Sequence, residues 1–268
     1  MSGFLLNPYI SFGEGVAFEG AAAAQILLTA DAQGEHDNSD PHFGSVLALL
    51  NFQTSITFND APSGFTINNS GLVLTTGSGG KFGEGVQQTV AGTGVLSGVN
   101  TDNWDFTTVD FTVECWVYRE NAVSAALLSH WRNASSQQAW WLGFDASGHL
   151  EVNFNAPVST PLAITAAGVT PNNAWSHVVF ERATTTFRLY QDGAMVGTKI
   201  TGNSSSLAAV TNAADDFLRI GLLSGGAQAF FDDDFPNRRM DEIRITRGVA
   251  RYNNDAGYTV PTGPFPTA

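Results

Sequence analysis

The chain has 268 residues, of which 14% are charged, and its 25 acidic and 12 basic residues give a formal net charge of −13 at pH 7. This balance argues against nucleic acid as a partner, because phosphate binding depends on Lys and Arg side chains that release counterions. It equally disfavours binding to an anionic membrane surface.

Cysteine content and hydropathy narrow the class of protein further. The single cysteine, Cys115, excludes an intramolecular disulfide and a zinc site built from cysteines. No apolar run approaches the ~20 residues of a membrane-spanning helix. A secretory signal begins with positive charge, whereas the first basic residue here is Lys81. We therefore expect a soluble chain that is not exported through such a signal.

Residues 1–40 differ in pattern from the rest of the chain. Glycines separate short apolar pieces such as Phe4–Leu6 and Ile26–Leu28, and none of them shows strand alternation or a capped helical period. Such a segment is too apolar for a solvated tail, yet it buries too little surface to fold alone. We expect an irregular N-terminal arm that packs on the following domain or anchors the chain to a partner, and the anchoring candidates are Phe4, Leu5, Leu6 and Tyr9.

From Pro41 onward the apolar residues recur with a period of two, which is the pattern of β-strands. In residues 111–118, one face would carry Phe111, Val113, Cys115 and Val117. Similar runs occupy residues 46–52, 64–74, 125–131, 139–144, 149–154, 175–181, 186–191, 195–200, 217–222 and 241–246. Short strands separated by regular turn signals predict an all-β sandwich or barrel.

The clearest hairpin joins residues 186–191 to residues 194–196. Between them stand Asp192 and Gly193, a pair that supplies the two positive-φ positions of a type I′ turn. We therefore expect this turn to connect two neighbouring antiparallel strands.

Several blocks share the order and spacing of one known domain family. The second half of the chain carries Trp175–Phe180, Phe187–Gly193, Arg219–Gly221 and Met240–Thr246, and the first half carries Val46–Phe52, Phe58–Asp60 and Phe111–Val117. Over residues 41–266 the chain resembles the laminin-G-like, concanavalin A-like domain. The ending, Thr246–Tyr252 with Pro261–Pro266, is similar to the version common in virion proteins of tailed bacteriophages. The opening residues 1–8 also look phage-like.

This resemblance implies a jelly-roll sandwich of two antiparallel sheets over residues 41–268. Because the inward faces of two stacked sheets form one core, we expect buried side chains at Phe111, Val113, Val117, Val178, Phe180, Leu189, Ile220, Ile243 and Ile245.

Some members of this superfamily are glycoside hydrolases, which in the retaining class need two carboxyl groups about 5–5.5 Å apart. No Glu-x-Asp-x-Glu motif occurs in the chain, and Glu114 has no acidic partner at positions 112, 116 or 118. Asp241 and Glu242 would point to opposite faces of a regular strand. His177 is out of phase with its apolar neighbours, so we expect it to be exposed or half-exposed. The sequence predicts a protein that is not an enzyme.

The resemblance also implies a structural calcium ion, which would take carboxylate and backbone oxygens. The usual carboxylate of the family matches Asp241, with Asp60 as a possible second ligand. The alternative is that Asp241 accepts hydrogen bonds from a neighbouring loop.

Carbohydrate binding would use aromatic rings on a loop or an outer face. Trp141 and Trp104 are the candidates, the first because adjacent Trp140 and Trp141 must face opposite ways on a strand. Packing in the core or between strands is the alternative for each ring.

We expect a non-enzymatic bacteriophage virion protein, assembled in the bacterial host cytoplasm. It would be displayed on the particle as a capsid decoration or accessory component, with capsid or tail proteins and copies of itself as partners. One alternative is a receptor-binding or tail-fibre module that recognises host surface polysaccharide, although the chain lacks a repetitive shaft. A further alternative is a glycan-binding or glycan-cleaving bacterial protein with no virion role.

Overall fold

The computed structural model describes residues 39–53, 55–57, 59–75, 79–88, 94–98, 102–132, 137–154, 162–203, 207–210, 217–223, 228–232 and 234–268. Residues Pro41–Thr267 form one compact unit. The proposed anchoring residues Phe4, Leu5, Leu6 and Tyr9 lie outside the described residues. No helix in the described part of the chain is long and apolar enough to cross a membrane.

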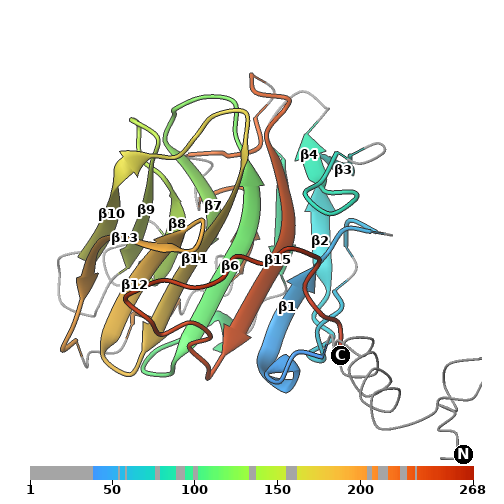
Figure 1. The fold of residues 1–268 in the computed structure, drawn as a ribbon. Helices are drawn as coiled ribbons and strands as arrows, with labels where there is room; N and C mark the ends of the chain where they lie inside the picture. Colours follow the sequence, from blue (N-terminus) through green and yellow to red (C-terminus); the bar gives the residue numbers. More distant parts are fainter. Residues whose placement is uncertain are drawn as a thin grey trace, which may run out of the picture. The chain divides into compact units, whose positions relative to one another are not determined.

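The first sheet faces the viewer in Figure 1. Its strands are β1 (Val46–Leu50), β3 (Leu72–Leu74), β4 (Val86–Gln88), β6 (Phe111–Tyr118), β11 (Trp175–Ala183), β12 (Thr186–Gln191), β13 (Ala194–Ile200) and β15 (Arg239–Arg247). They run in the order β13-β12-β11-β6-β15-β4-β3, and β1 also pairs with β15.

The second sheet packs behind the first. Its strands are β2 (Ile67–Ser70), β5 (Val95–Gly98), β7 (Ala125–His130), β8 (Trp140–Phe144), β9 (His149–Phe154), β10 (Leu162–Val169) and β14 (Arg219–Ile220). Their order is β10-β9-β8-β7-β14-β5-β2, and neighbouring strands pair antiparallel in both sheets. Two short 3₁₀ helices, Phe43–Ser45 and Asp102–Trp104, complete the described regular structure. The predicted all-β antiparallel jelly-roll sandwich is confirmed.

The core lies between the two sheets. All nine side chains that the alternation predicts to be buried are at most 1% exposed. Aromatic rings fill the space between β6, β9, β11 and β12, where Phe111, Phe154, Phe180 and Phe187 form stacked, tilted and edge-on pairs. Such pairs add to the stabilisation that their buried area provides.

The predicted hairpin joins β12 to β13. Asp192 and Gly193 have φ angles of 49° and 83°, as a type I′ turn requires. A Cβ on Gly193 would lie 2.6 Å from the carbonyl oxygen of Tyr258, and the Tyr258 N–H donates to the Gly193 carbonyl oxygen at 2.8 Å. Glycine therefore serves both the turn and its close contact with the C-terminal part of the chain.

That C-terminal part, residues 248–266, is called the C-terminal strap below. It crosses the outer face of the first sheet, over the middle and lower parts of β12, β11, β6 and β15 in Figure 1. As a result the outward-facing Thr112 and Glu114 of β6 are fully buried. The expectation of an exposed or half-exposed His177 is wrong for the same reason, because this side chain is fully buried.

Candidate functional site

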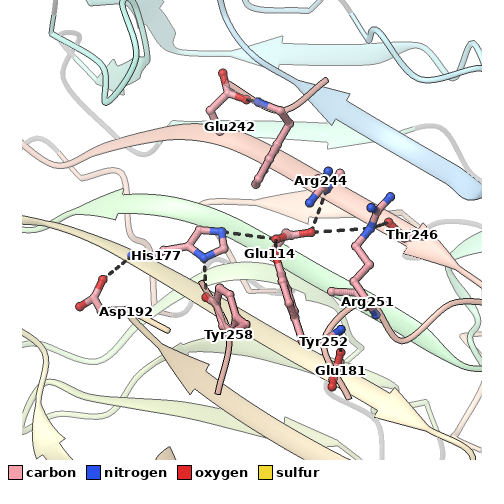
Figure 2. Close-up of polar contacts among 12 residues, drawn as sticks. Glu114, His177, Glu181, Asp192, Glu242, Arg244, Thr246, Arg251, Tyr252 and Tyr258 are labelled. Carbon is pink, nitrogen blue, oxygen red and sulfur yellow. Dashed lines mark hydrogen bonds and ion pairs between the residues drawn. The ribbon is translucent and has the colours of Figure 1, made fainter. Parts of the chain in front are cut away.

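A buried polar network joins the first sheet to the C-terminal strap, as Figure 2 shows. Glu114 is its centre. Its Oε1 accepts a hydrogen bond from Arg244 Nε of β15 at 2.8 Å, and its Oε2 accepts one from the Tyr252 hydroxyl of the strap at 2.6 Å. Arg251 Nε, also from the strap, lies 3.8 Å from Oε1. One carboxylate thus binds two strands and the strap together.

His177 of β11 forms the second contact with the strap. Its Nδ1 and the Tyr258 hydroxyl are joined by a hydrogen bond of 2.5 Å, and its Nε2 lies 3.4 Å from Glu114 Oε2. The backbone N–H of His177 donates to the Asp192 carboxylate at 2.8 Å, which fastens the β12–β13 turn to the start of β11. The imidazole is therefore held from both sides.

Glu181, farther along β11, forms the third contact. Its oxygens accept hydrogen bonds from the backbone N–H groups of Tyr252 and Asn253 and from the Tyr190 hydroxyl, at 3.1, 2.6 and 2.9 Å. Burial raises the pKa of Glu181, and these donors oppose the rise.

Electrostatics explain why Glu114 can be charged in the interior. Burial by itself raises the pKa of a carboxyl group, but the Arg244 guanidinium and His177 outweigh burial and hold the pKa of Glu114 well below its usual range. Burial and the nearby Glu114 charge raise the pKa of Tyr252, so its hydroxyl stays protonated and donates. Since Glu114, His177 and Glu181 are fully buried, the network as it stands fastens the strap and does not face a substrate.

The predicted calcium ligand Asp241 lies at an irregularity of β15. The pairing register with β6 shifts between Asp241 and Arg244, and Glu242 has a positive φ of 48°. This is a β-bulge, and it buries both carboxyl groups, whereas a regular strand would turn them to opposite faces. Asp241 Oδ2 accepts hydrogen bonds from the backbone N–H groups of Lys81 and Phe82 at 2.8 and 3.0 Å, and its Oδ1 accepts one from Glu242 N–H at 2.8 Å.

This arrangement matches the alternative interpretation of Asp241, and a calcium ion at this carboxylate stays a prediction. Three backbone N–H donors occupy its oxygens, as in the alternative in which a neighbouring loop binds this carboxylate. Among the described residues, no group of three or more His, Cys, Asp and Glu side chains could hold a metal ion. Glu242 Oε1 and Asp60 Oδ2 are buried and have no hydrogen-bond partner, so a bound cation at Asp60 stays a prediction.

Trp104 and Trp141, the predicted glycan contacts, lie at separate places in the sandwich. Trp104 is fully buried in the main core, where its carbonyl oxygen accepts a hydrogen bond from Trp140 Nε1. Trp141 is 6% exposed and packs with Ala126, Trp131 and Leu223 in a small cluster apart from the main core. These positions favour the packing alternative for both rings.

A pair of half-exposed rings instead lies on the first sheet. Trp175 of β11 and Tyr118 of β6 are direct cross-strand partners, with ring centroids 5.7 Å apart. Arg239 of β15 is the partner of Tyr118 on its other side, and its guanidinium lies 4.8 Å from the Tyr118 ring centre. The strand alternation could place these rings on one face, but the neighbour relation of β11, β6 and β15 could not be deduced from the sequence pattern.

The Glu114–Arg244 ion pair gives the first prediction. Arg244→Met leaves the Glu114 charge buried without its main partner, so the free energy of unfolding should fall by about 3–5 kcal/mol. The double variant Glu114→Gln/Arg244→Met should recover much of this loss, because it removes the buried charge as well. Urea unfolding of the three proteins measures this, and equal loss in the single and double variants would contradict the charge argument.

A second prediction concerns pH. Burial, with Asp241 and Asp60 nearby, raises the pKa of Glu242 from 4.5 to about 8, and burial raises that of Asp241 from 3.8 to about 6. The folded state therefore holds protons that the unfolded state has released, and stability is lost as pH rises from about 4.5 to 8. Between pH 6 and 8.5, Glu242→Gln should flatten the fall in melting temperature, whereas Glu84→Gln should not.

The same melting curves test the calcium prediction. A cation held at Asp60 and Glu242 would stabilise the ionised carboxylates, so EDTA would lower the melting temperature of the wild type and leave that of Glu242→Gln unchanged. An equal response of the two proteins to EDTA would count against a cation there.

Comparisons with known proteins agree with this fold. Residues 93–249 match the Laminin_G_3 family, described as the concanavalin A-like lectin/glucanases superfamily. No curated protein sequence matches the chain. Among solved structures, the binding domain of Paraclostridial Mosquitocidal Protein 1 is similar with a TM-score of 0.60 and 13% identity, over 78% of this chain and 50% of that one.

Two further structures are similar at the level of the fold. The binding domain of Botulinum Neurotoxin DC in complex with SialylT has a TM-score of 0.54 and 14% identity, over 76% of this chain and 48% of that one. Domain 4 of AbnA, an extracellular arabinanase from Geobacillus stearothermophilus, in complex with arabinotriose, has a TM-score of 0.52 and 14% identity, over 76% and 93%. The chain spans about half the length of the toxin domains. Since the family model covers more than half of its residues, the chain belongs to the Laminin_G_3 family of the concanavalin A-like lectin/glucanases superfamily.

Proposed function

We propose that the chain is a non-catalytic module that binds glycans on a cell surface. The observation that carries this proposal is the half-exposed pair of Tyr118 and Trp175, whose rings lie side by side on the outer face of the first sheet. An aromatic side chain at a surface offers a flat apolar ring together with a polar group, which suits the apolar faces and hydroxyl edges of sugars. The arabinotriose and SialylT complexes of structures with the same fold add support.

The acidic groups of the first sheet support a non-catalytic role. Glu114 and Glu181 are fully buried, and their oxygens accept hydrogen bonds from the C-terminal strap. A glycoside hydrolase needs its two carboxyl groups beside the bond that is cut. Here the carboxylates stabilise the attachment of the strap.

The finer proposal is that this module is part of a bacteriophage particle. The support is the similarity of Thr246–Tyr252 and Pro261–Pro266 to virion proteins, together with the apolar, irregular pattern of residues 1–40. Residues 1–40 would anchor the chain to capsid or tail proteins, and the sandwich would face outward as a decoration or as a receptor-binding element.

Binding to a glycan array tests the proposed function. Trp175→Ala should lower binding at least tenfold while the melting temperature stays within a few degrees of the wild type. The control is Trp141→Phe, on the other sheet, which should keep full binding. Loss of binding in the control alone would place the site at Trp141, and release of sugars from a bound polysaccharide would contradict a non-catalytic role.

The virion proposal has its own test. Antibody labelling of intact phage particles, followed by electron microscopy, should locate the chain on the particle surface. Many copies with the symmetry of the head indicate decoration, and a few copies at the tail indicate host binding. Detection of the chain in bacterial cells but never on phage particles would contradict the proposal.

A further inference from the structure

We infer that the ring pair on the first sheet selects saccharides that carry a carboxylate group. This inference rests on the proposed glycan-binding function and deepens it. The residues concerned are called the cation–aromatic patch, and they are Lys81, Phe82, Trp116, Tyr118, Trp175 and Arg239.

Two cations lie over the aromatic rings of this patch. The Lys81 ammonium is 4.0 Å from the Trp116 ring centre, and the Arg239 guanidinium is 4.8 Å from the Tyr118 ring centre. Both are cation–π contacts. The side chains come from three adjacent strands and one loop, and Tyr118, which lies under the Arg239 guanidinium, is the direct cross-strand partner of the half-exposed Trp175.

In the described part of the structure, neither Lys81 nor Arg239 forms an ion pair with a carboxylate, so their charges are not neutralised by a direct partner. Elsewhere Arg188 and Lys199 form ion pairs with Asp255, and Arg244 does so with Glu114. Two carboxylates near the patch have other partners: Asp241, two positions from Arg239, accepts three backbone N–H bonds, and Glu120, two positions from Tyr118, accepts hydrogen bonds from Asn237. The patch therefore presents positive charge that an anionic ligand can use.

Two donor groups without an acceptor lie beneath the patch. Trp116 Nε1 and Arg239 Nε are buried and have no acceptor, and a buried donor without an acceptor costs about 1–3 kcal/mol. The two side chains lie on the same face at neighbouring rows, since Arg239 pairs with Tyr118 and Asp241 pairs with Trp116. Both atoms donate only, so they add to the positive potential beneath the patch, and because they are buried they are not themselves contacts for a ligand.

The patch is held in place before any ligand binds. Asp241 fixes the loop through the N–H groups of Lys81 and Phe82, and Arg239 Nη1 donates to the Gly79 carbonyl oxygen at 3.0 Å. The Phe82 ring meets Trp116 edge-on at 5.7 Å. A preorganised site loses less side-chain entropy on binding. Uronic acids and sialic acids share the required chemistry, namely a carboxylate beside an apolar ring face.

Calorimetry with matched sugars tests the inference. The probes are a galacturonic acid hexasaccharide and its carboxyl-reduced form, and sialyllactose and lactose. At least one acidic probe should bind ten times more tightly than its neutral counterpart in 50 mM NaCl, and this preference should shrink in 500 mM NaCl because salt screens exposed charges. The pair that shows the preference identifies a uronic or a sialic acid as the ligand.

Variants separate the inference from the proposed function. Lys81→Gln and Arg239→Gln should each remove most of the preference for the acidic probe. Lys199→Gln, which changes the chain's other lysine, and Phe235→Ala, which removes a half-exposed ring 4.1 Å from Arg238, should leave it unchanged. Melting temperatures should stay near that of the wild type.

The outcomes show whether the acidic-sugar inference, the proposed glycan-binding function, or both are wrong. If neutral and acidic probes bind equally, and Trp175→Ala alone abolishes binding, the acidic-sugar inference is overturned and the glycan-binding function stands. If no probe binds and the glycan array is also blank, both fail together. If Lys199→Gln lowers the preference as much as Lys81→Gln does, the effect is one of overall charge and the patch is not the site.

Discussion

The buried carboxylate of Glu114 is the interaction on which the outer layer of this molecule depends. A charge taken out of water costs several kcal/mol unless strong partners compensate it. Here the compensation comes from Arg244 of the neighbouring strand and from Tyr252 and Arg251 of the C-terminal strap. The sheet therefore needs the strap to remain folded with this charge inside, and the strap needs the sheet because residues 248–266 contain no regular secondary structure.

This dependence also locates the part of the sheet that can bind a ligand. Where the strap lies on the sheet, polar side chains are buried and engaged with one another. Arg239, Tyr118 and Trp175 form a row of cross-strand partners on β15, β6 and β11, and these three side chains remain half-exposed. Attachment of the strap and presentation of the aromatic rings thus use different parts of one sheet face.

The sequence pattern predicted most of the strands because alternation of apolar and polar residues is a local property. β6 and β12 have the predicted bounds, whereas β10 was not predicted, since Leu162–Val169 is dominated by alanine, glycine and threonine and shows little contrast between its faces. The burial of His177 was missed for a different reason. A period of two shows which side chains share a face, but not that a segment about 80 residues later covers that face.

The same limit applies to the site residues. The sequence singles out Asp241, but its partners Lys81 and Phe82 lie about 160 positions away. The bulge at Glu242 depends on how β15 pairs with β6, which no local pattern reveals. The sequence contains one signal that the outer face of this sheet is covered. The strap is rich in aromatic residues, namely Tyr252, Tyr258 and Phe265, and they lie over the outward-pointing Glu114 and His177.

The pairing of β1 with β15 has a consequence for biosynthesis. Val46 of β1 is the cross-strand partner of Thr246 of β15. The first described strand therefore cannot pair with β15 until nearly the whole sandwich has been synthesised. Contacts between parts of a chain that are distant in sequence form slowly. Until they form, β1 has an unpaired edge and the Glu114 carboxylate lacks its partners on β15 and the strap. Shortening the chain before residue 239 would remove β15 and leave β1 without the strand that it pairs with.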